Sequence, residues 1–308
     1  MATYTQDQLN RYLDHISFPQ SKHPSDPLQL LTQLQARHIA RVPFESVSLH
    51  YSVHRKLSLD LGDLLDKVVV KSRGGYCHEM NYFFGCVMRT LGYEVLHAGG
   101  RVNAMGKYTG MSHTINLVTI NNQRYLVDVA FGSSEALHPI PLLLHSPTPF
   151  PNLLPRRGKL EFRALSHSTS PSTQQLWIYS LQENPSEDWV EQYCFTETEL
   201  FREDYEINNF YTESHPSSFF VKNVVAMRGI WSEEKGQLEG MMTLFGDEVR
   251  RRVGGEMEVV EKLKSEGDRV RALEEYFYIP LDEEERAAIQ GHPSEFENVT
   301  DHANVRHF

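Results

Sequence analysis

The spacing of apolar residues changes its period near residue 93, and this change limits the folds that the chain can adopt. Before that point apolar side chains recur every three or four residues, which is typical of amphipathic helices. One such stripe consists of Leu9, Tyr12, Leu13 and Ile16. After it, apolar and polar residues alternate as they do in strands, in residues 94–102, 112–120 and 124–131. The chain is therefore predicted to be an α+β protein whose helices come first.

The last helix of the N-terminal part is predicted to run from about Tyr76 to Leu91. Apolar residues cover most of its surface, so we expect it to be deeply buried, and Gly92 follows as a C-terminal stop. Farther along, residues 195–224 are rich in acidic, amide and aromatic residues, which indicates a connecting helix and loop. A final helix is predicted at residues 268–279, and the polar tail after it is expected to fray.

Charge and composition exclude several classes of partner. The 308 residues carry a formal net charge of −11, so the chain lacks the broad positive field that nucleic acid or an anionic membrane surface requires. Its N-terminus does not resemble a signal peptide, and no apolar stretch approaches the about 18 residues of a membrane span. Three cysteines without paired short spacing describe neither a disulfide framework nor a zinc ribbon. We therefore expect a cytoplasmic protein that binds no metal.

Cys77 stands in a context that favours a reactive thiolate. It follows the sequence RGGY at residues 73–76 and lies in the first turn of the predicted buried helix. Free N–H groups and the positive end of the dipole at a helix N-terminus stabilise a thiolate, and the glycines allow other backbone to approach closely. Cys86 lies about two and a half turns farther on, on the opposite face, and is predicted to be an inert core residue. Cys77 is therefore the candidate nucleophile.

Two residues on adjacent predicted strands are suited to act with this thiol. A thiolate nucleophile needs a partner that handles protons, usually a histidine oriented by a carboxylate or amide. His113 opens one predicted strand and Asp128 lies near the end of the next. Because a short turn centred near Asn122 joins the two strands, we expect a hairpin that brings His113 and Asp128 within lateral reach.

Other interpretations of these residues are weaker. A metal site built from Cys77, His78, Glu79 and His113 is disfavoured, because adjacent helical residues diverge by about 100°. Glu79 is instead expected to interact favourably with the positive end of the helix dipole or to form an ion pair with Arg73.

The segment of residues 106–112 is predicted to be a loop of small residues before His113. Its free amides and Lys107 are suited to cradle a phosphate, although most such loops are only turns. The chain contains no GxGxxG or GxxxxGK[ST] nucleotide signature.

Five short segments resemble, in order, the motifs of the arylamine N-acetyltransferase family. Residues 73–79 are similar to its RGGxCxE signature, and residues 127–132 to its VDxGFG segment. The full set is VPFES at 42–46, RGGYCHE at 73–79, TGMSH at 109–113, VDVAFG at 127–132 and NFYTESHPSSF at 209–219. Each motif is short, but five in the same order, within a likeness that covers about residues 10 to 280, identify the chain as a member of that family.

The resemblance implies a fold with three parts and a cysteine-protease-like Cys-His-Asp core. The expected parts are a helical bundle at residues 1–92 that carries Cys77, a β-barrel at 93–197 that carries His113 and Asp128, and an α/β lid with a polar tail at 229–308. An interdomain segment at 198–228 is expected to join the last two parts.

The resemblance also implies a reaction and its contacts. Acetyl-coenzyme A is the expected acyl donor and an arylamine or hydrazine the expected acceptor, with Cys77, His113 and Asp128 as catalytic triad. Expected coenzyme contacts are Thr109, Gly110, Tyr211, Ser217 and Lys107, and expected substrate contacts are Phe44, Phe131 and Val102.

Four positions near the expected site depart from the family pattern, which predicts an altered pocket. These positions are Ser46, His78, Met80 and Ala130. Malonyl-CoA or another acyl donor is therefore an alternative to acetyl-CoA. Two further alternatives are a Cys-His-Asp hydrolase, because the order of catalytic residues is the same, and a catalytically silent binding protein that kept the fold.

Overall fold

The computed structural model describes residues 2–145, 148–166 and 168–296, and over these ranges the protein is α+β, as predicted. The helices are α1 (Gln6–His15), α2 (Pro27–Arg41), α3 (Leu61–Leu65), α4 (Cys77–Thr90), α5 (Arg202–Ser214), α6 (Phe219–Lys222), α7 (Glu266–Phe277) and α8 (Glu283–Ala288). The strands are β1 (Phe44–Glu45), β2 (Glu94–Ala104), β3 (Lys107–Ile120), β4 (Gln123–Val127), β5 (Ile140–Pro141), β6 (Phe150–Pro151), β7 (Arg157–Ala164), β8 (Gln175–Gln182), β9 (Val190–Glu199), β10 (Val225–Ser232), β11 (Gln237–Phe245), β12 (Glu248–Val253) and β13 (Glu256–Lys262).

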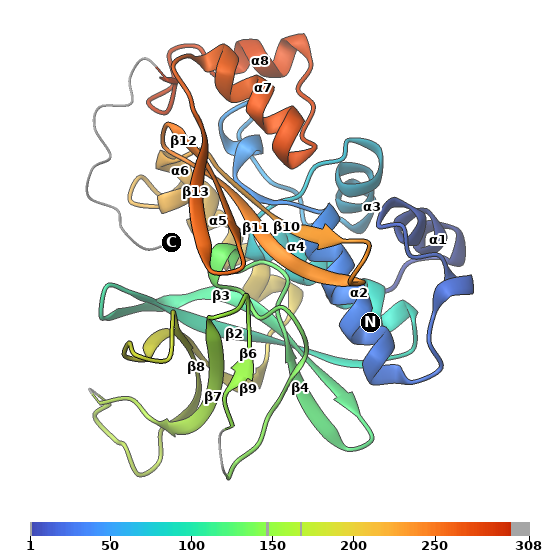
Figure 1. The fold of residues 1–308 in the computed structure, drawn as a ribbon, viewed down its shortest axis with the longest axis vertical. Coiled ribbons are helices and arrows are strands. Elements are labelled where there is room, and N and C mark those ends of the chain that lie inside the picture. Colours follow the sequence, from blue (N-terminus) through green and yellow to red (C-terminus); the bar gives the residue numbers. More distant parts are fainter. Residues whose placement is uncertain (1, 146–147, 167, 297–308) are drawn as a thin grey trace.

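Eight strands form one curled antiparallel sheet, seen in green and yellow in the lower half of Figure 1. Its order is β5-β4-β3-β2-β9-β8-β7-β6, and within the described residues β5 and β6 pair with no further strand on their outer sides. Each edge strand has two residues and includes a proline, Pro141 or Pro151, which has no N–H to donate to another strand. The predicted barrel is therefore an open half-barrel.

β3 is longer than the predicted strand, and this corrects the prediction of a loop at residues 106–112. The turn is made by Met105 and Gly106, both at positive φ, and pairing with β2 resumes at Lys107. The sequence did not predict this part of the strand, because Gly110 and Ser112 interrupt the alternation of apolar and polar residues that marks a strand. His113 consequently lies in the middle of β3 and not at its start.

The turn between β3 and β4 has the predicted form, but β4 ends earlier than predicted. Asn121 and Asn122 both have positive φ, as a two-residue hairpin turn requires. β4 stops at Val127, so Asp128 begins the loop that follows. This loop is held in place from α2, where Gln35 Nε2 donates to the backbone oxygens of Asp128 and Ala136 at 3.0 and 2.6 Å.

α4 is the central helix of the first core and packs against the half-barrel. Every residue from Cys77 to Met88 is buried, as predicted for this helix. Its apolar side chains share one cluster with residues of α1, α2, β3 and β4. Among the described residues, no helix combines the length and apolarity needed to cross a membrane.

A second sheet, in the order β1-β10-β11-β12-β13, lies under α7 in the upper half of Figure 1. Its buried face and α7 form a separate apolar cluster. The prediction that the tail frays after Pro280 is wrong for residues 281–296, because Ile289 is buried in this cluster and the buried Arg269 donates to the backbone oxygen of Ser294 at 2.9 Å.

Candidate active site

The loop that leads into α4 runs too close to its neighbours for side chains at two positions. A Cβ atom on Gly74 would lie 1.6 Å from the backbone oxygen of Pro43, and one on Gly75 would lie 2.3 Å from Glu79 Oε2. The two glycines therefore allow the close approach that the sequence predicted. Cys77 follows as the first residue of α4, with 4% of its surface exposed.

Buried ion pairs surround this loop. One of the two roles predicted for Glu79 was an ion pair with Arg73, and that prediction is wrong. Arg73 lies 3.3 Å from Glu45 and 3.1 Å from Glu285, whereas Glu79 pairs with Lys67 at 2.6 Å. Burial raises the pKa of Glu79 in spite of Lys67. Burial also acts to raise the pKa of Glu45, but Arg73 and Lys67 outweigh it and lower that pKa overall.

His113 and Asp128 form a buried pair beside Cys77. His113 Nε2 lies 2.7 Å from Asp128 Oδ2, and Cys77 Sγ lies 3.8 Å from the backbone oxygen of Ser112. Burial acts to lower the pKa of His113, but the Asp128 carboxylate and the Cys77 thiol raise it overall to about 10. Burial acts to raise the pKa of Asp128, but His113 and hydrogen bonds from Asn81 and a backbone N–H lower it overall. The structure thus places the three predicted residues together.

Asn81 holds this pair in place, and the sequence analysis gave it no role. It is fully buried one turn after Cys77, and its Nδ2 donates to Asp128 Oδ1 at 2.9 Å and to the backbone oxygen of Thr114 at 2.6 Å. Its Oδ1 accepts from the backbone N–H of Val129 at 3.1 Å. The spacing of four residues from Cys77, which puts both side chains on one helix face, was the available signal.

Two of the predicted substrate contacts, Phe131 and Val102, lie near His113 on the half-barrel. The ring centroids of Phe131 and Tyr193 lie 4.9 and 5.0 Å from that of His113. Val102 is directly opposite Tyr193 in the register of β2 and β9, so the two side chains share one face of the half-barrel. The sequence analysis did not single out Tyr193.

The third predicted substrate contact, Phe44, belongs to an aromatic group at the start of α4. Its ring centroid lies 5.8 Å from that of Phe220 in α6. Phe220 in turn stacks on Tyr76, the residue before Cys77, with centroids 5.2 Å apart.

Two of the predicted coenzyme contacts on β3 differ in their distance from Cys77. Thr109 contacts Ser112, whose backbone oxygen lies 3.8 Å from Cys77 Sγ, whereas Lys107 lies at the far end of the strand. Thr109 Oγ1 lies 2.8 Å from Ser112 Oγ, and a Cβ on Gly110 would meet nothing within 4 Å. Lys107 is exposed at the hairpin turn, six residues from His113, which corresponds to about 20 Å along an extended strand.

The remaining predicted coenzyme contacts, Tyr211 and Ser217, lie together at the end of α5. Their hydroxyl oxygens are 3.4 Å apart, and the Tyr211 ring stacks on that of His215 with centroids 4.5 Å apart. Both residues are exposed.

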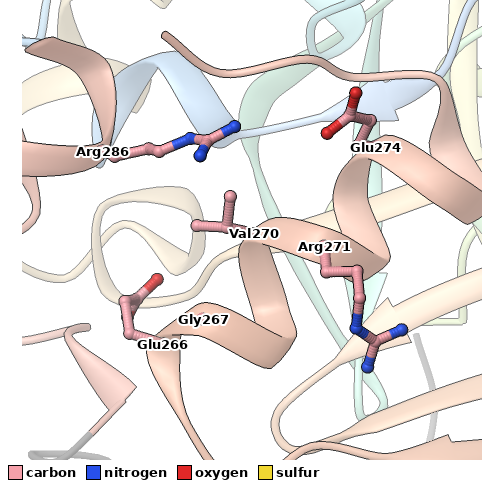
Figure 2. A pocket seen from close by; sticks show the side chains of 6 residues that line it. All are labelled: Glu266, Gly267, Val270, Arg271, Glu274 and Arg286. Atoms are coloured by element: carbon pink, nitrogen blue, oxygen red, sulfur yellow. The ribbon is translucent and has the colours of Figure 1, made fainter. Parts of the chain in front are cut away.

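A separate hollow of about 340 Å³ lies between α7 and α8, where Figure 2 shows Arg286 and Glu274 on opposite sides of Val270. None of its lining residues belongs to α4, to β3 or to the loop that carries Asp128. Among the described residues, no group of three or more His, Cys, Asp or Glu side chains is arranged to hold a metal ion.

Comparisons with known proteins identify the family. A family model described as N-acetyltransferase matches residues 27–286. N-malonyltransferase FDB2 from Fusarium pseudograminearum (strain CS3096) is 36% identical over 318 residues, covering 93% of this chain and 92% of its own length. Arylamine N-acetyltransferase 1 from Oryctolagus cuniculus is 30% identical over 221 residues, covering 69% and 74%. Mycobacterium marinum arylamine N-acetyltransferase in complex with CoA has a TM-score of 0.75 at 24% identity, covering 92% of this chain and 99% of that one. The chain therefore belongs to the arylamine N-acetyltransferase family.

Proposed function

We propose that this protein transfers an acyl group from an acyl-coenzyme A to the amino group of a small amine, with Cys77 carrying the acyl group as a thioester. The observation that carries the proposal is the buried arrangement of Cys77, His113 and Asp128, with 2.7 Å between the histidine and the carboxylate. A family relative solved with CoA supports coenzyme A as the carrier of the acyl group.

The proposed reaction has two halves. In the first, the Cys77 thiolate attacks the thioester carbonyl, a bond from carbon to Cys77 sulfur forms as the bond to the coenzyme sulfur breaks, and the leaving thiolate takes a proton from His113. In the second, the amine nitrogen attacks the acyl-cysteine and gives its proton to His113, which regenerates the thiolate. Asp128 supports the positive charge on His113 before the first half and after the second, when the imidazolium stands beside the free Cys77 thiolate.

The acyl group is proposed to be acetyl or malonyl. Acetyl-CoA is the donor that the sequence resemblance implies, whereas the relative named N-malonyltransferase matches over 93% of the chain and the rabbit acetyltransferase over 69%. The greater similarity to the malonyltransferase favours malonyl-CoA. A malonyl group carries a carboxylate that needs hydrogen-bond donors. We propose that Thr109 and Ser112, whose hydroxyl oxygens lie 2.8 Å apart on the strand that carries His113, supply them.

The acceptor is proposed to be an arylamine or hydrazine. Phe131, which is partly exposed beside His113 and packs on the buried ring of Tyr193, provides an aromatic face against which an aryl ring packs. The proposed reaction requires no metal ion. We also propose that the protein is cytoplasmic.

Incubation with an acyl-CoA in the absence of amine is expected to leave one acyl group on Cys77. Intact-mass spectrometry should show an increase of about 42 Da with acetyl-CoA or about 86 Da with malonyl-CoA, located on Cys77 after proteolysis. The donor that gives the faster adduct identifies the acyl group. Absence of an adduct with every acyl-CoA in a panel would contradict the transferase proposal and favour a hydrolase or a silent protein.

Cys77 is expected to react with iodoacetamide at pH 6 much faster than a model thiol. Because the pKa of His113 is raised to about 10, its imidazolium persists through neutral pH and holds a thiolate beside it. The enhancement over the model thiol should shrink above about pH 8.5, where the model thiol itself ionises. Alkylation rates measured across this range check the prediction, and a Cys77 rate equal to that of the model thiol at pH 6 favours a silent protein.

A further inference from the structure

A chain of hydrogen bonds, buried except at its Arg89 end, runs from the far end of α4 to Asp128. Arg89 Nη1 lies 2.7 Å from His97 Nε2, and His97 Nδ1 lies 2.9 Å from Asn116 Oδ1. Asn116 Nδ2 donates to the backbone oxygen of Asn81 at 2.9 Å. The Asn81 side chain then donates to Asp128 Oδ1 at 2.9 Å. The chain thus links a cation on α4 to the carboxylate of the candidate triad.

Chemistry fixes the direction of these bonds. An arginine only donates, so His97 Nε2 accepts and the ring proton resides on Nδ1, from which it is donated to Asn116. The Asn116 amide is then left to donate to the backbone of Asn81, whose side chain makes the last donation, to Asp128. Burial, assisted by Arg89, lowers the pKa of His97 to about 3, so the ring stays neutral.

The residues packed around His97 leave room for this chain of hydrogen bonds. A Cβ on Gly85 would lie 2.3 Å from His97 Cε1 and 2.5 Å from Asn116 Oδ1. Glycine inside a helix is destabilising relative to alanine, so its place in α4 is explained by the space that the pair needs. The rings of Tyr82 and Tyr205 flank His97 with centroids 5.4 and 5.5 Å away, and burial raises the pKa of both phenols.

We propose that His97 and Asn116 are positioning residues for the triad. They hold Asn81, and through it the Asp128 carboxylate, in the orientation that leaves Oδ2 for His113. Asn116 is suited to this role because it is opposite Val127 in the register of β3 and β4, directly before Asp128. The proposal rests on the proposed acyl transfer at Cys77, which is the reaction that the held carboxylate serves.

The test compares His97→Leu with His97→Gln. Glutamine retains one acceptor and one donor, whereas leucine of similar size retains neither. We expect His97→Leu to lower kcat by about tenfold or more, with the KM for acyl-CoA unchanged, as for an interaction made only in the transition state. The alkaline limb of the rate profile should also move to lower pH, because a displaced Asp128 supports the His113 imidazolium less well. His97→Gln should restore most of both properties.

A second pair of variants tests the same chain of hydrogen bonds at a residue whose replacement is less disruptive to folding. Arg89 is only half-buried, so Arg89→Met and Arg89→Lys are expected to fold, and the methionine variant should show the same pH shift in smaller measure. Thermal unfolding of each variant separates lost stability from altered chemistry.

Rates of Cys77 alkylation across pH distinguish the two proposals. If the unsubstituted protein forms no acyl adduct, the proposed function fails, yet the alkylation profiles of the four variants still test the positioning role. If the adduct forms and both leucine and methionine variants match the unsubstituted protein in kcat and in pH profile, the positioning role is overturned.

Discussion

Cys77→Ser is expected to abolish acyl transfer and to leave the fold intact. A serine hydroxyl beside His113 is not ionised near neutral pH, so neither the attack on the thioester nor its storage as acyl-cysteine takes place. We expect kcat to fall by more than about 10⁴-fold, the range seen when a nucleophile is removed from a triad. Release of free coenzyme A with a fixed arylamine measures the loss, and thermal unfolding should show a nearly unchanged midpoint.

The other two cysteines provide matched controls. Cys86 and Cys194 are buried and unpaired, and burial raises the pKa of each thiol to about 11. Cys86→Ser and Cys194→Ser are therefore expected to keep the activity and the acyl adduct. Substantial turnover by Cys77→Ser, or loss of the adduct only in one of the controls, would show that the nucleophile is assigned wrongly.

Asp128→Asn is the second substitution with a large expected effect. The amide keeps the size of the carboxylate but removes the charge that raises the pKa of His113, and it permits the wrong tautomer of the ring. A fall in kcat of about 10³ to 10⁴-fold is expected, by comparison with the same change in a serine protease triad. The alkaline limb of the kcat profile should also move from about pH 10 toward the ordinary range of histidine, because His113 then loses at lower pH the proton that the leaving thiolate takes.

Glu135→Gln is the control for this change. Glu135 is a second buried carboxyl close enough to feel the charge of Asp128, and burial together with that charge raises its pKa well above the usual value. Both effects favour the uncharged acid, so replacement by the uncharged glutamine should leave kcat and the pH profile nearly unchanged. Equal effects of Asp128→Asn and Glu135→Gln would argue against a specific role of Asp128.

The elements that the sequence predicted well are those with a strong local pattern. The buried helix α4 and the Asn121-Asn122 turn follow from apolar spacing and from turn chemistry. The first half of β3 was missed because glycine and serine break its alternation. The ordered segment at 281–296 was missed because its few apolar residues find partners on distant helices.

The candidate site divides in the same way. Cys77, His113 and Asp128 were predictable, since a glycine-flanked cysteine and a hairpin are local features. Asn81 and the chain through His97 were not, because their roles depend on which strand lies against α4. The partner of Arg73 was also out of reach, since Glu285 lies 212 residues farther along the chain.

This long separation has a consequence for synthesis of the protein. The buried guanidinium of Arg73, four residues before Cys77, pairs with Glu285 in α8, and β1, which flanks the same loop, pairs with β10. When a ribosome has made only α1 to α4 and the half-barrel, neither contact can yet form, because β10 and α8 have not been synthesised. The nucleophile loop therefore acquires its final set of neighbours only after nearly the whole chain has emerged, and a prematurely terminated product carries every triad residue without that support.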